Sequence, residues 1–298
     1  MNKAFTGRLA LIAPASAIAD EVFDATLAQL EVQGIDYHLG RNVRARHRYL
    51  AGTQAQRLDD LHEAFSLPDI DAVWCLRGGY GCAQLLPGVD WALLQRASPR
   101  PLIGYSDLSL LLDAFGRNGL PAIHGPVTTA LGLQALSAPS GQHERLASMR
   151  SLWDLLQSRS HSLPARHISG PASAVQGPLV GGNLTALASG CGTIAGMQLP
   201  TDAILILEDV GEPYYRLERS FWQLFESFGE RRPAAVCLGS FTDCPRRGVQ
   251  HSIEEIIGEY LAPFDIPLYG DLPSGHGDAN FAWPYGRPGT LQGQRLSW

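Results

Sequence analysis

The sequence predicts a two-domain α/β protein, in which a parallel sheet flanked by helices precedes a smaller, strand-rich α/β domain. Up to about residue 120, short apolar runs alternate with segments whose apolar residues recur at helical spacing. Between 161 and 182 the composition shifts to Ser, Pro, Gly and Ala with little periodicity, which is typical of a connection between domains. We therefore expect domains over 1–160 and 183–298, joined by residues 161–182.

The first domain is expected to be flavodoxin- or Rossmann-like, because alternating strands and helices favour a parallel sheet covered on both faces. We expect strands at 9–13, 35–39, 72–76 and 101–104, and helices at 20–33, 53–65 and 107–115. The second of these helices is clear, since Leu58, Leu61 and Phe65 fall on one face. In such sheets, reactive groups gather beyond the carboxyl ends of the strands.

The second domain shows apolar strand-like runs at 203–207 and 234–238, and helical segments at 217–228 and 253–260. Its end is rich in glycine and proline, and no internal repeat has a fixed period. These features predict a β-rich α/β unit.

Charge and hydropathy exclude several classes of partner. The net charge is −6 with 17% charged residues, so no basic excess would neutralise a nucleic acid or an anionic membrane. The apolar run at 9–13 is too short for a secretory segment and is interrupted by Pro14. No stretch approaches the roughly 20 apolar residues of a membrane helix. A cytoplasmic protein without nucleic-acid or membrane partners is expected.

Lysine and cysteine usage narrows the chemistry further. Lys3 is the one lysine among 23 basic residues, which argues against a lysine base, a Schiff-base lysine or a phosphate-binding P-loop. Carboxylate recognition by arginine remains open. Five cysteines, with no pair at metal-knuckle or redox spacing, are expected to be reduced core residues: Cys75, Cys82, Cys191, Cys237 and Cys244.

The segment Gly104-Tyr105-Ser106-Asp107 has the pattern of a nucleophile elbow. A buried strand ends, a serine follows, and a helix begins at once, so the turn would expose the hydroxyl beside backbone amides at the helix start. Leu108 departs from the hydrolase pattern, which would place glycine there. The alternative is that Ser106 or Asp107 simply caps the helix.

A glycine-rich loop, LRGGYG at 76–81, follows another apolar strand. It lacks the spacing and the lysine of a phosphate-binding loop, so we interpret it as an oxyanion loop. The amides of Gly79 and Asp107 are the candidate donors.

His276 and Glu208 are the candidate base and orienting acid. His276 lies between two glycines on a loop, where a plain surface position is the alternative to general-base catalysis. Glu208 directly follows five apolar residues, and a buried carboxylate needs a partner. That partner would be His276 in a triad or, alternatively, Arg216 or Arg219 in an ion pair.

These stretches resemble the LD-carboxypeptidases, serine peptidases that remove a terminal D-amino acid from murein tetrapeptide, together with their microcin-immunity relatives. The matching segments run in order along nearly the whole chain: APAS at 13–16, LRGGYG at 76–81, GYSD at 104–107, HGP at 124–126, GGNL at 181–184, LEDV at 207–210 with Tyr215-Arg216, and GHG at 275–277.

The resemblance implies a Ser106, His276 and Glu208 triad, an oxyanion hole formed by Gly79 and Asp107, and a homodimer that acts in cell-wall recycling. It implies neither a metal nor a cofactor. Because the free carboxylate of the leaving D-alanine has to be recognised, Arg77 and Arg216 are candidates by position.

Two other functions stay open. A microcin-immunity-like hydrolase of peptidyl nucleotides would need aromatic residues for base stacking, and Trp222, Trp283 and Tyr285 could serve. A non-catalytic α/β binding module could instead use the glycine loop for a nucleotide or sugar.

Overall fold

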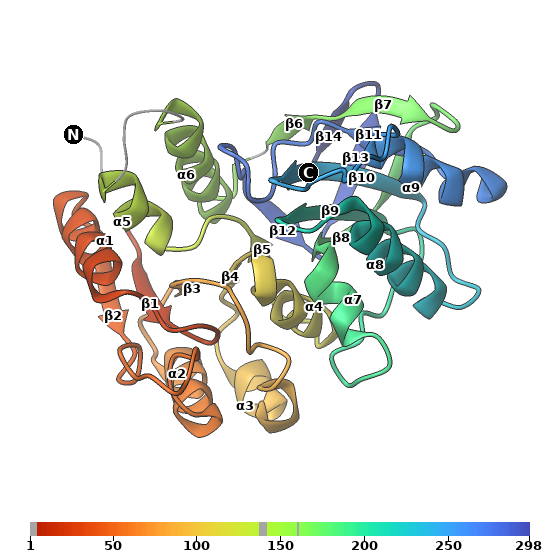
Figure 1. Ribbon diagram of the computed structural model, residues 1–298. Coiled ribbons are helices and arrows are strands. Elements are labelled where there is room, and N and C mark those ends of the chain that lie inside the picture. Colours follow the sequence, from red (N-terminus) through yellow and green to blue (C-terminus); the bar gives the residue numbers. More distant parts are fainter. Residues whose placement is uncertain (1–4, 137–141, 160) are drawn as a thin grey trace.

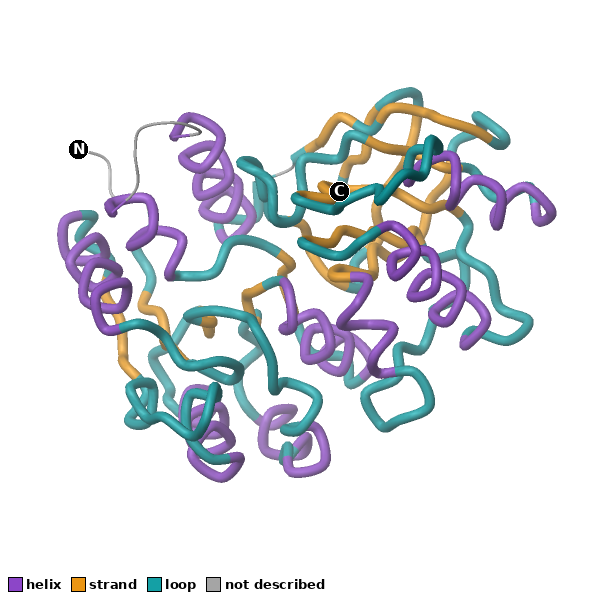
Figure 2. Tube along the Cα trace, viewed as in Figure 1, coloured by secondary structure: helices purple, strands orange, loops and turns teal. Residues whose placement is uncertain are grey.

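The computed structural model describes residues 5–136, 142–159 and 161–298, so Lys3 lies outside the described residues. Within these residues the strands form a six-stranded and an eight-stranded sheet, each flanked by helices (Figure 1). The tube in Figure 2 shows the two groups of strands side by side, with helices around them. The predicted α/β class is confirmed.

The first sheet has the order β12-β5-β4-β3-β1-β2, and β1 to β5 are parallel. Its strands are β1 (Arg8–Ile12), β2 (Asp36–Leu39), β3 (Ala72–Cys75), β4 (Leu102–Gly104), β5 (Ala122–His124) and β12 (Trp283–Tyr285). The strand β12 comes from the carboxyl-terminal part of the chain and pairs antiparallel with β5. The parallel arrangement agrees with the prediction.

Helices cover both faces of this sheet because its strands are apolar on both sides. Along β1, Ala10 and Ile12 pack on one face, while Leu9 and Leu11 pack on the other. The flanking helices are α1 (Asp20–Val32), α2 (Gln54–Ser66), α3 (Trp91–Arg96), α4 (Ser109–Arg117), α5 (Thr129–Leu136) and α6 (Gln142–Leu156), with the short turns η1 (Leu86–Gly88) and η2 (Ser106–Leu108).

The second sheet has the order β6-β14-β13-β8-β9-β10-β11-β7. Its strands are β6 (Ser162–Pro164), β7 (Arg166–Ser169), β8 (Val175–Asn183), β9 (Ile204–Val210), β10 (Ala235–Thr242), β11 (Leu268–Gly270), β13 (Pro288–Gln292) and β14 (Arg295–Ser297). Its helical elements are α7 (Leu184–Gly190), α8 (Tyr214–Ser227), α9 (Ile253–Leu261) and η3 (Ala262–Phe264). The expected strand-rich character of this part is confirmed.

Residues 161–182, which composition marks as a connecting segment, form β6, β7 and most of β8 instead of an irregular chain. The glycines that look like loop signals have a packing role here. A Cβ at Gly181 would lie 1.9 Å from the carbonyl oxygen of Ile206 on β9, so only glycine permits this close pairing of strands. The domain limits themselves stay a prediction.

All five cysteines lie in the described part of the chain and are free. Cys75, Cys82 and Cys237 are buried, whereas Cys191 and Cys244 are partly exposed. Burial raises the pKa of each of the three buried thiols. In the same described residues no helix is long and apolar enough to cross a membrane.

One apolar core continues from the first sheet into the second. Leu110 and Leu111 of α4 belong to the same buried cluster as Leu184 and Leu187 of α7. A polar contact crosses the same region, because the hydroxyl of Tyr285 donates to Asp113 Oδ1 and accepts from the amide of Gly181, both at 3.2 Å. The two sheets are therefore joined by packing and by buried hydrogen bonds.

We predict that Tyr285→Phe lowers the free energy of unfolding by about 1–3 kcal/mol, because it removes the hydrogen-bond partner of the buried Gly181 amide and leaves the Asp113 carboxylate with Arg117 alone. Urea unfolding would measure the loss. Tyr269→Phe is the matched control, since this side chain is largely buried while its hydroxyl forms no hydrogen bond within the described residues, and it should cost less than about 0.5 kcal/mol. Equal effects of the two substitutions would contradict a role for Tyr285 in joining the sheets.

Candidate active site

Ser106 lies at the turn where β4 ends and η2 begins, in a strained conformation. Its φ of 67° is in the left-handed region, which residues other than glycine rarely adopt. A Cβ at Gly104 would lie 2.2 Å from Leu108 Cδ1, so a larger residue there would force the buried Leu108 side chain to move. The predicted elbow is therefore present, and Leu108 packs against Gly104.

Helix capping, the alternative role for Ser106 and Asp107, is excluded by their side-chain partners. Asp107 Oδ2 accepts the amide of Cys82 at 2.9 Å, and neither η2 nor α4 has a side-chain cap at its start. The hydroxyl of Ser106 contacts His276 instead.

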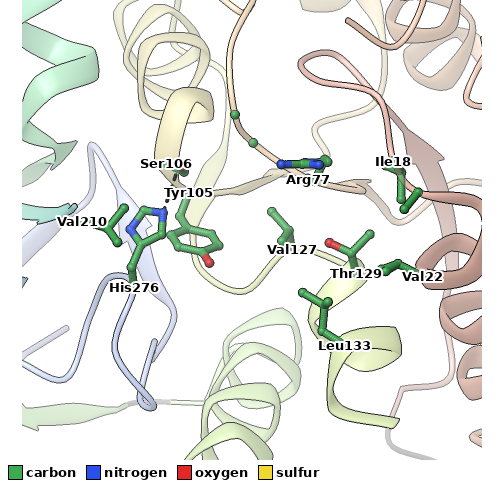
Figure 3. Close-up of a pocket in the computed structure, with 13 residues that line it drawn as sticks. Ile18, Val22, Arg77, Tyr105, Ser106, Val127, Thr129, Leu133, Val210 and His276 are labelled. Atoms are coloured by element: carbon green, nitrogen blue, oxygen red, sulfur yellow. Dashed lines mark hydrogen bonds between the residues drawn. The ribbon is translucent and has the colours of Figure 1, made fainter. Parts of the chain in front are cut away.

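His276 joins the serine to the predicted acid. Its Nε2 lies 3.1 Å from Ser106 Oγ (Figure 3). Its Nδ1 lies 2.7 Å from Glu208 Oε2. Glu208 is fully buried on β9, and its one ion-pair partner within the described residues is His276. Arg216 pairs with Glu212 instead, and Arg219 forms no ion pair with Glu208. The structure thus brings together three residues that are far apart in the sequence.

The loop that carries His276 is held by polar contacts that the sequence did not reveal. Gly275 has φ 118°, and a Cβ there would lie 2.7 Å from Glu208 Oε2. Its amide donates to Asn280 Oδ1, and the amide of Gly277 donates to Ser240 Oγ, both at 3.0 Å. Ser240 and Asn280 are ordinary polar residues in the sequence, so only the fold identifies them.

Tyr105 packs against the imidazole of His276, with ring centroids 4.7 Å apart. Burial, and then the negative charge of Glu208, raise the pKa of Tyr105 to about 12. The phenol therefore stays neutral and can donate a hydrogen bond into the cavity that it lines.

Of the two predicted oxyanion donors, Asp107 directly follows Ser106, and Gly79 lines the same cavity as Ser106. Gly79 has φ 112°, and its amide donates to no backbone carbonyl within the described residues. The neighbouring glycine packs directly on the serine, since a Cβ at Gly78 would lie 2.8 Å from Ser106 Cβ. The amide of Asp107 is in the first turn of η2, where amides lack an intrahelical acceptor.

The two candidate arginines are placed differently. A cavity of about 510 Å³ adjoins Ser106, and Arg77 lines it while donating to the carbonyl of Ala17 at 3.1 Å (Figure 3). Arg216 is exposed on α8 and does not line this cavity; its guanidinium contacts Glu212 and the hydroxyl of Tyr215. Of these two arginines, Arg77 therefore lines the cavity at Ser106 and Arg216 does not.

His124 is a fully buried neighbour of the site. It stacks on Trp283 with centroids 4.7 Å apart and lies edge-on to Tyr105 at 6.0 Å. Neither ring nitrogen has a hydrogen-bond partner among the described residues. Burial, and then the nearby His276, lower the pKa of His124 to about 3, so its imidazole is neutral.

Comparison with known proteins identifies the family of the chain. Residues 9–125 match the LD-carboxypeptidase N-terminal domain, and residues 176–291 match the LD-carboxypeptidase C-terminal domain. The chain belongs to the LD-carboxypeptidase family and is therefore a peptidase.

Among its relatives is the murein tetrapeptide carboxypeptidase of Pseudomonas aeruginosa, which is 65% identical over 98% of this chain and 95% of that one. The muramoyltetrapeptide carboxypeptidase of Oxalobacter formigenes has a similar structure, with a TM-score of 0.83, 26% identity and 97% of each chain covered. The microcin C7 self-immunity protein MccF shares the fold, with a TM-score of 0.85 at 20% identity over 98% of this chain and 95% of that one.

We predict that His124→Phe makes folding less sensitive to acid. The folded-state pKa of about 3 is below the ordinary 6.5, so between these values the unfolded chain binds a proton that the folded protein excludes. Stability from this residue is therefore present above about pH 6.5 and lost as the pH falls. From pH 7.5 to pH 5 the wild-type protein should lose about 2 kcal/mol more than the variant.

Urea unfolding at the two pH values measures this difference. Asp113, whose pKa burial raises to about 6, acts in the opposite direction but is present in both proteins and cancels. Identical pH dependence of the two proteins would show that His124 is not held neutral by the fold.

Proposed function

We propose that this chain is a serine LD-carboxypeptidase that removes the terminal D-alanine from murein tetrapeptide in cell-wall recycling. The observation that carries the proposal is the position of His276, within hydrogen-bond distance of both Ser106 Oγ and Glu208 Oε2. A curated relative at 65% identity is a murein tetrapeptide carboxypeptidase, which supports the substrate.

In the proposed mechanism, neutral His276 accepts the proton of Ser106 through Nε2 as Oγ attacks the scissile carbonyl. Glu208 accepts a hydrogen bond from Nδ1–H and so fixes the tautomer and stabilises the imidazolium. The amides of Gly79 and Asp107 donate to the oxyanion. The imidazolium then gives its proton to the leaving amine, and water hydrolyses the acyl-enzyme in a second round.

We assign recognition of the terminal carboxylate to Arg77. Among the described residues that line the cavity at Ser106, Arg77 is the one arginine, lysine, aspartate or glutamate, and the other walls are mostly apolar. An arginine there can form a charge-assisted hydrogen bond with a carboxylate while the apolar walls accept the methyl group of alanine. Arg216, the other candidate, would reach substrate only after a rearrangement, because it is exposed outside this cavity.

The cellular setting is part of the same proposal. Five free cysteines are consistent with a reducing compartment, which favours a cytoplasmic location.

Exposed aromatic side chains at Tyr215 and Trp222 lie seven residues apart on one face of α8 and offer a contact for a homodimer.

The triad predicts a large and specific loss of turnover. Ser106→Ala and His276→Ala should each lower kcat for D-alanine release from murein tetrapeptide by about 10⁴ to 10⁶, with the unfolding transition unchanged. Ser109→Ala is the control, because Ser109 lies close to Ser106 in the chain but is buried and accepts a hydrogen bond from the amide of Asn183. It shows how much turnover is lost when a serine hydroxyl of this region is removed without touching the triad.

The same assay separates the alternatives. Relatives named as microcin self-immunity proteins keep a peptidyl nucleotide open as substrate. Release of a nucleotide from a peptidyl adenylate, without cleavage of the tetrapeptide, would replace the proposed substrate. Cleavage of neither substrate by the wild-type protein would instead favour a non-catalytic binding module, and full turnover by Ser106→Ala would show that Ser106 is not the nucleophile.

A further inference from the structure

The two proposed oxyanion donors come from loops on different strands. The amide of Gly79 belongs to the glycine-rich loop at 76–81, which follows β3, whereas the amide of Asp107 belongs to the turn that follows β4. Gly79 and Gly81 have φ values of 112° and 123°, and no Cβ restricts the backbone at either position. An oxyanion hole works only if both amides point at the same place. Contacts outside the loop therefore have to fix its conformation.

A buried carboxylate joins the two loops. Asp107 is 7% exposed, and its Oδ2 accepts the amide hydrogen of Cys82 at 2.9 Å. Cys82 directly follows the glycine-rich loop. Asp107 thus offers one proposed oxyanion donor with its backbone and holds the loop of the other donor with its side chain.

A buried cation holds the other end of the same peptide group. Arg57 of α2 is 1% exposed, and its Nη1 donates to the carbonyl of Gly81 at 3.0 Å and to the carbonyl of Pro14 at 2.7 Å. The carbonyl of Gly81 and the amide of Cys82 belong to one peptide group. This group therefore lies between a guanidinium at its oxygen and a carboxylate at its N–H. Hydrogen bonds to charged partners of this kind are stronger than those between neutral groups.

The two charges also stabilise each other across the peptide group. Burial raises the pKa of Asp107, while the hydrogen bonds from Cys82 and then the positive charge of Arg57 oppose that rise. Close packing adds to the constraint, because a Cβ at Gly81 would lie 2.7 Å from Arg57 Nη1. Neither side chain takes part in the proton transfers of the triad, so the proposed mechanism leaves this buried pair without a role.

We propose that Arg57 and the side chain of Asp107 are positioning residues of the oxyanion hole. By holding the Gly81–Cys82 peptide group from both ends, they keep the amide of Gly79 directed toward the same point as the amide of Asp107. The inference rests on the proposed function. Without these contacts the loop populates conformations in which the amide of Gly79 points elsewhere. Because the oxyanion forms only after Ser106 has attacked, the loss should appear in kcat and not in KM.

Asp107→Ala tests the carboxylate, because it keeps the backbone amide and removes the contact with Cys82. It should lower kcat for D-alanine release by about 10- to 100-fold, somewhat less than the loss of a whole oxyanion donor, and change KM by less than about threefold. Asp107→Asn retains an oxygen that can accept the amide of Cys82. This conservative variant should restore kcat to within about fivefold of the wild-type value.

Arg57→Gln tests the cation, and it also serves as the test if Asp107→Ala does not fold. It should lower kcat by about tenfold or more, again with little change in KM. Both side chains hold one peptide group, so their effects should not be independent. The double variant Arg57→Gln/Asp107→Ala should therefore lose much less than the product of the two single losses.

Two controls separate positioning from a general loss of stability. Arg100→Gln removes another arginine that is 3% exposed and that donates to backbone carbonyls at the carboxyl-terminal end of α2. Asp60→Ala removes a carboxylate that is 3% exposed and that accepts the amide of Asn42. Neither residue lines the cavity at Ser106. Both changes should lower the melting temperature but leave kcat within about twofold of the wild-type value.

Labelling of Ser106 by a serine-directed phosphonate gives a second measurement that needs no peptide substrate. Negative charge develops on the phosphonyl oxygen as Oγ attacks phosphorus, so the same amides stabilise it. The second-order rate constant for labelling should fall in Asp107→Ala and Arg57→Gln by about the same factor as kcat. It should stay close to the wild-type value in the two controls.

Losses of kcat no larger than those of the controls, or a loss that appears mainly as a higher KM, would overturn the inference and leave the proposed function intact. Single losses that multiply in the double variant would also overturn it, because the two side chains would then act separately. If the wild-type protein is labelled but cleaves no tetrapeptide, the proposed substrate is rejected, and the labelling rates alone decide the inference. A wild-type protein that is neither labelled nor active would reject both.

Discussion

The proposed catalysis depends on one contact, the hydrogen bond between Ser106 of the first sheet and His276. The hydrogen-bond partner of His276, Glu208, belongs to the second sheet. Because the reacting side chains come from two sheets, their geometry depends on how firmly the interface between the sheets is packed. Three features form this interface: a shared apolar core, the pairing of strand β12 with β5, and the buried hydrogen bonds of Tyr285. The position of the base is therefore a property of the whole chain.

Local strain and unsatisfied polar groups are found at this interface between the two sheets. Ser106 has a positive φ, a conformation that costs about 1–3 kcal/mol in a residue other than glycine. Glu208 Oε1 and both nitrogens of His124 are buried without a hydrogen-bond partner among the described residues. Such groups persist only where the surrounding packing fixes them, and they occur preferentially at functional sites. Here the two packed sheets supply that constraint.

Much of this arrangement could be predicted from local sequence patterns. The parallel first sheet follows from the alternation of strand and helix periods, and the elbow follows from a serine placed between a buried strand and a helix. A buried acid after five apolar residues and a histidine between glycines indicated Glu208 and His276, while the family resemblance connected them. These features have strong local signals because backbone geometry restricts which residues fit.

The remainder depends on contacts that local patterns do not encode. Glycines in β8 look like loop residues, yet Gly181 is required by the close approach of β9. The pairing of β12 with β5 joins segments about 160 residues apart, so nothing near either strand predicts it. Arg77 and Arg216 both follow motif residues, but only the fold shows that the first lines the cavity at Ser106.

Covalent labelling tests the central contact most directly. A serine-directed phosphonate should modify Ser106 of the wild-type protein, with the site identified by mass spectrometry of the digested chain. Labelling should be lost in Ser106→Ala and slowed by at least about 10³ in His276→Ala, since the hydroxyl reacts only when the imidazole takes its proton. Unchanged labelling in His276→Ala, or modification at another serine, would show that these two side chains do not act together.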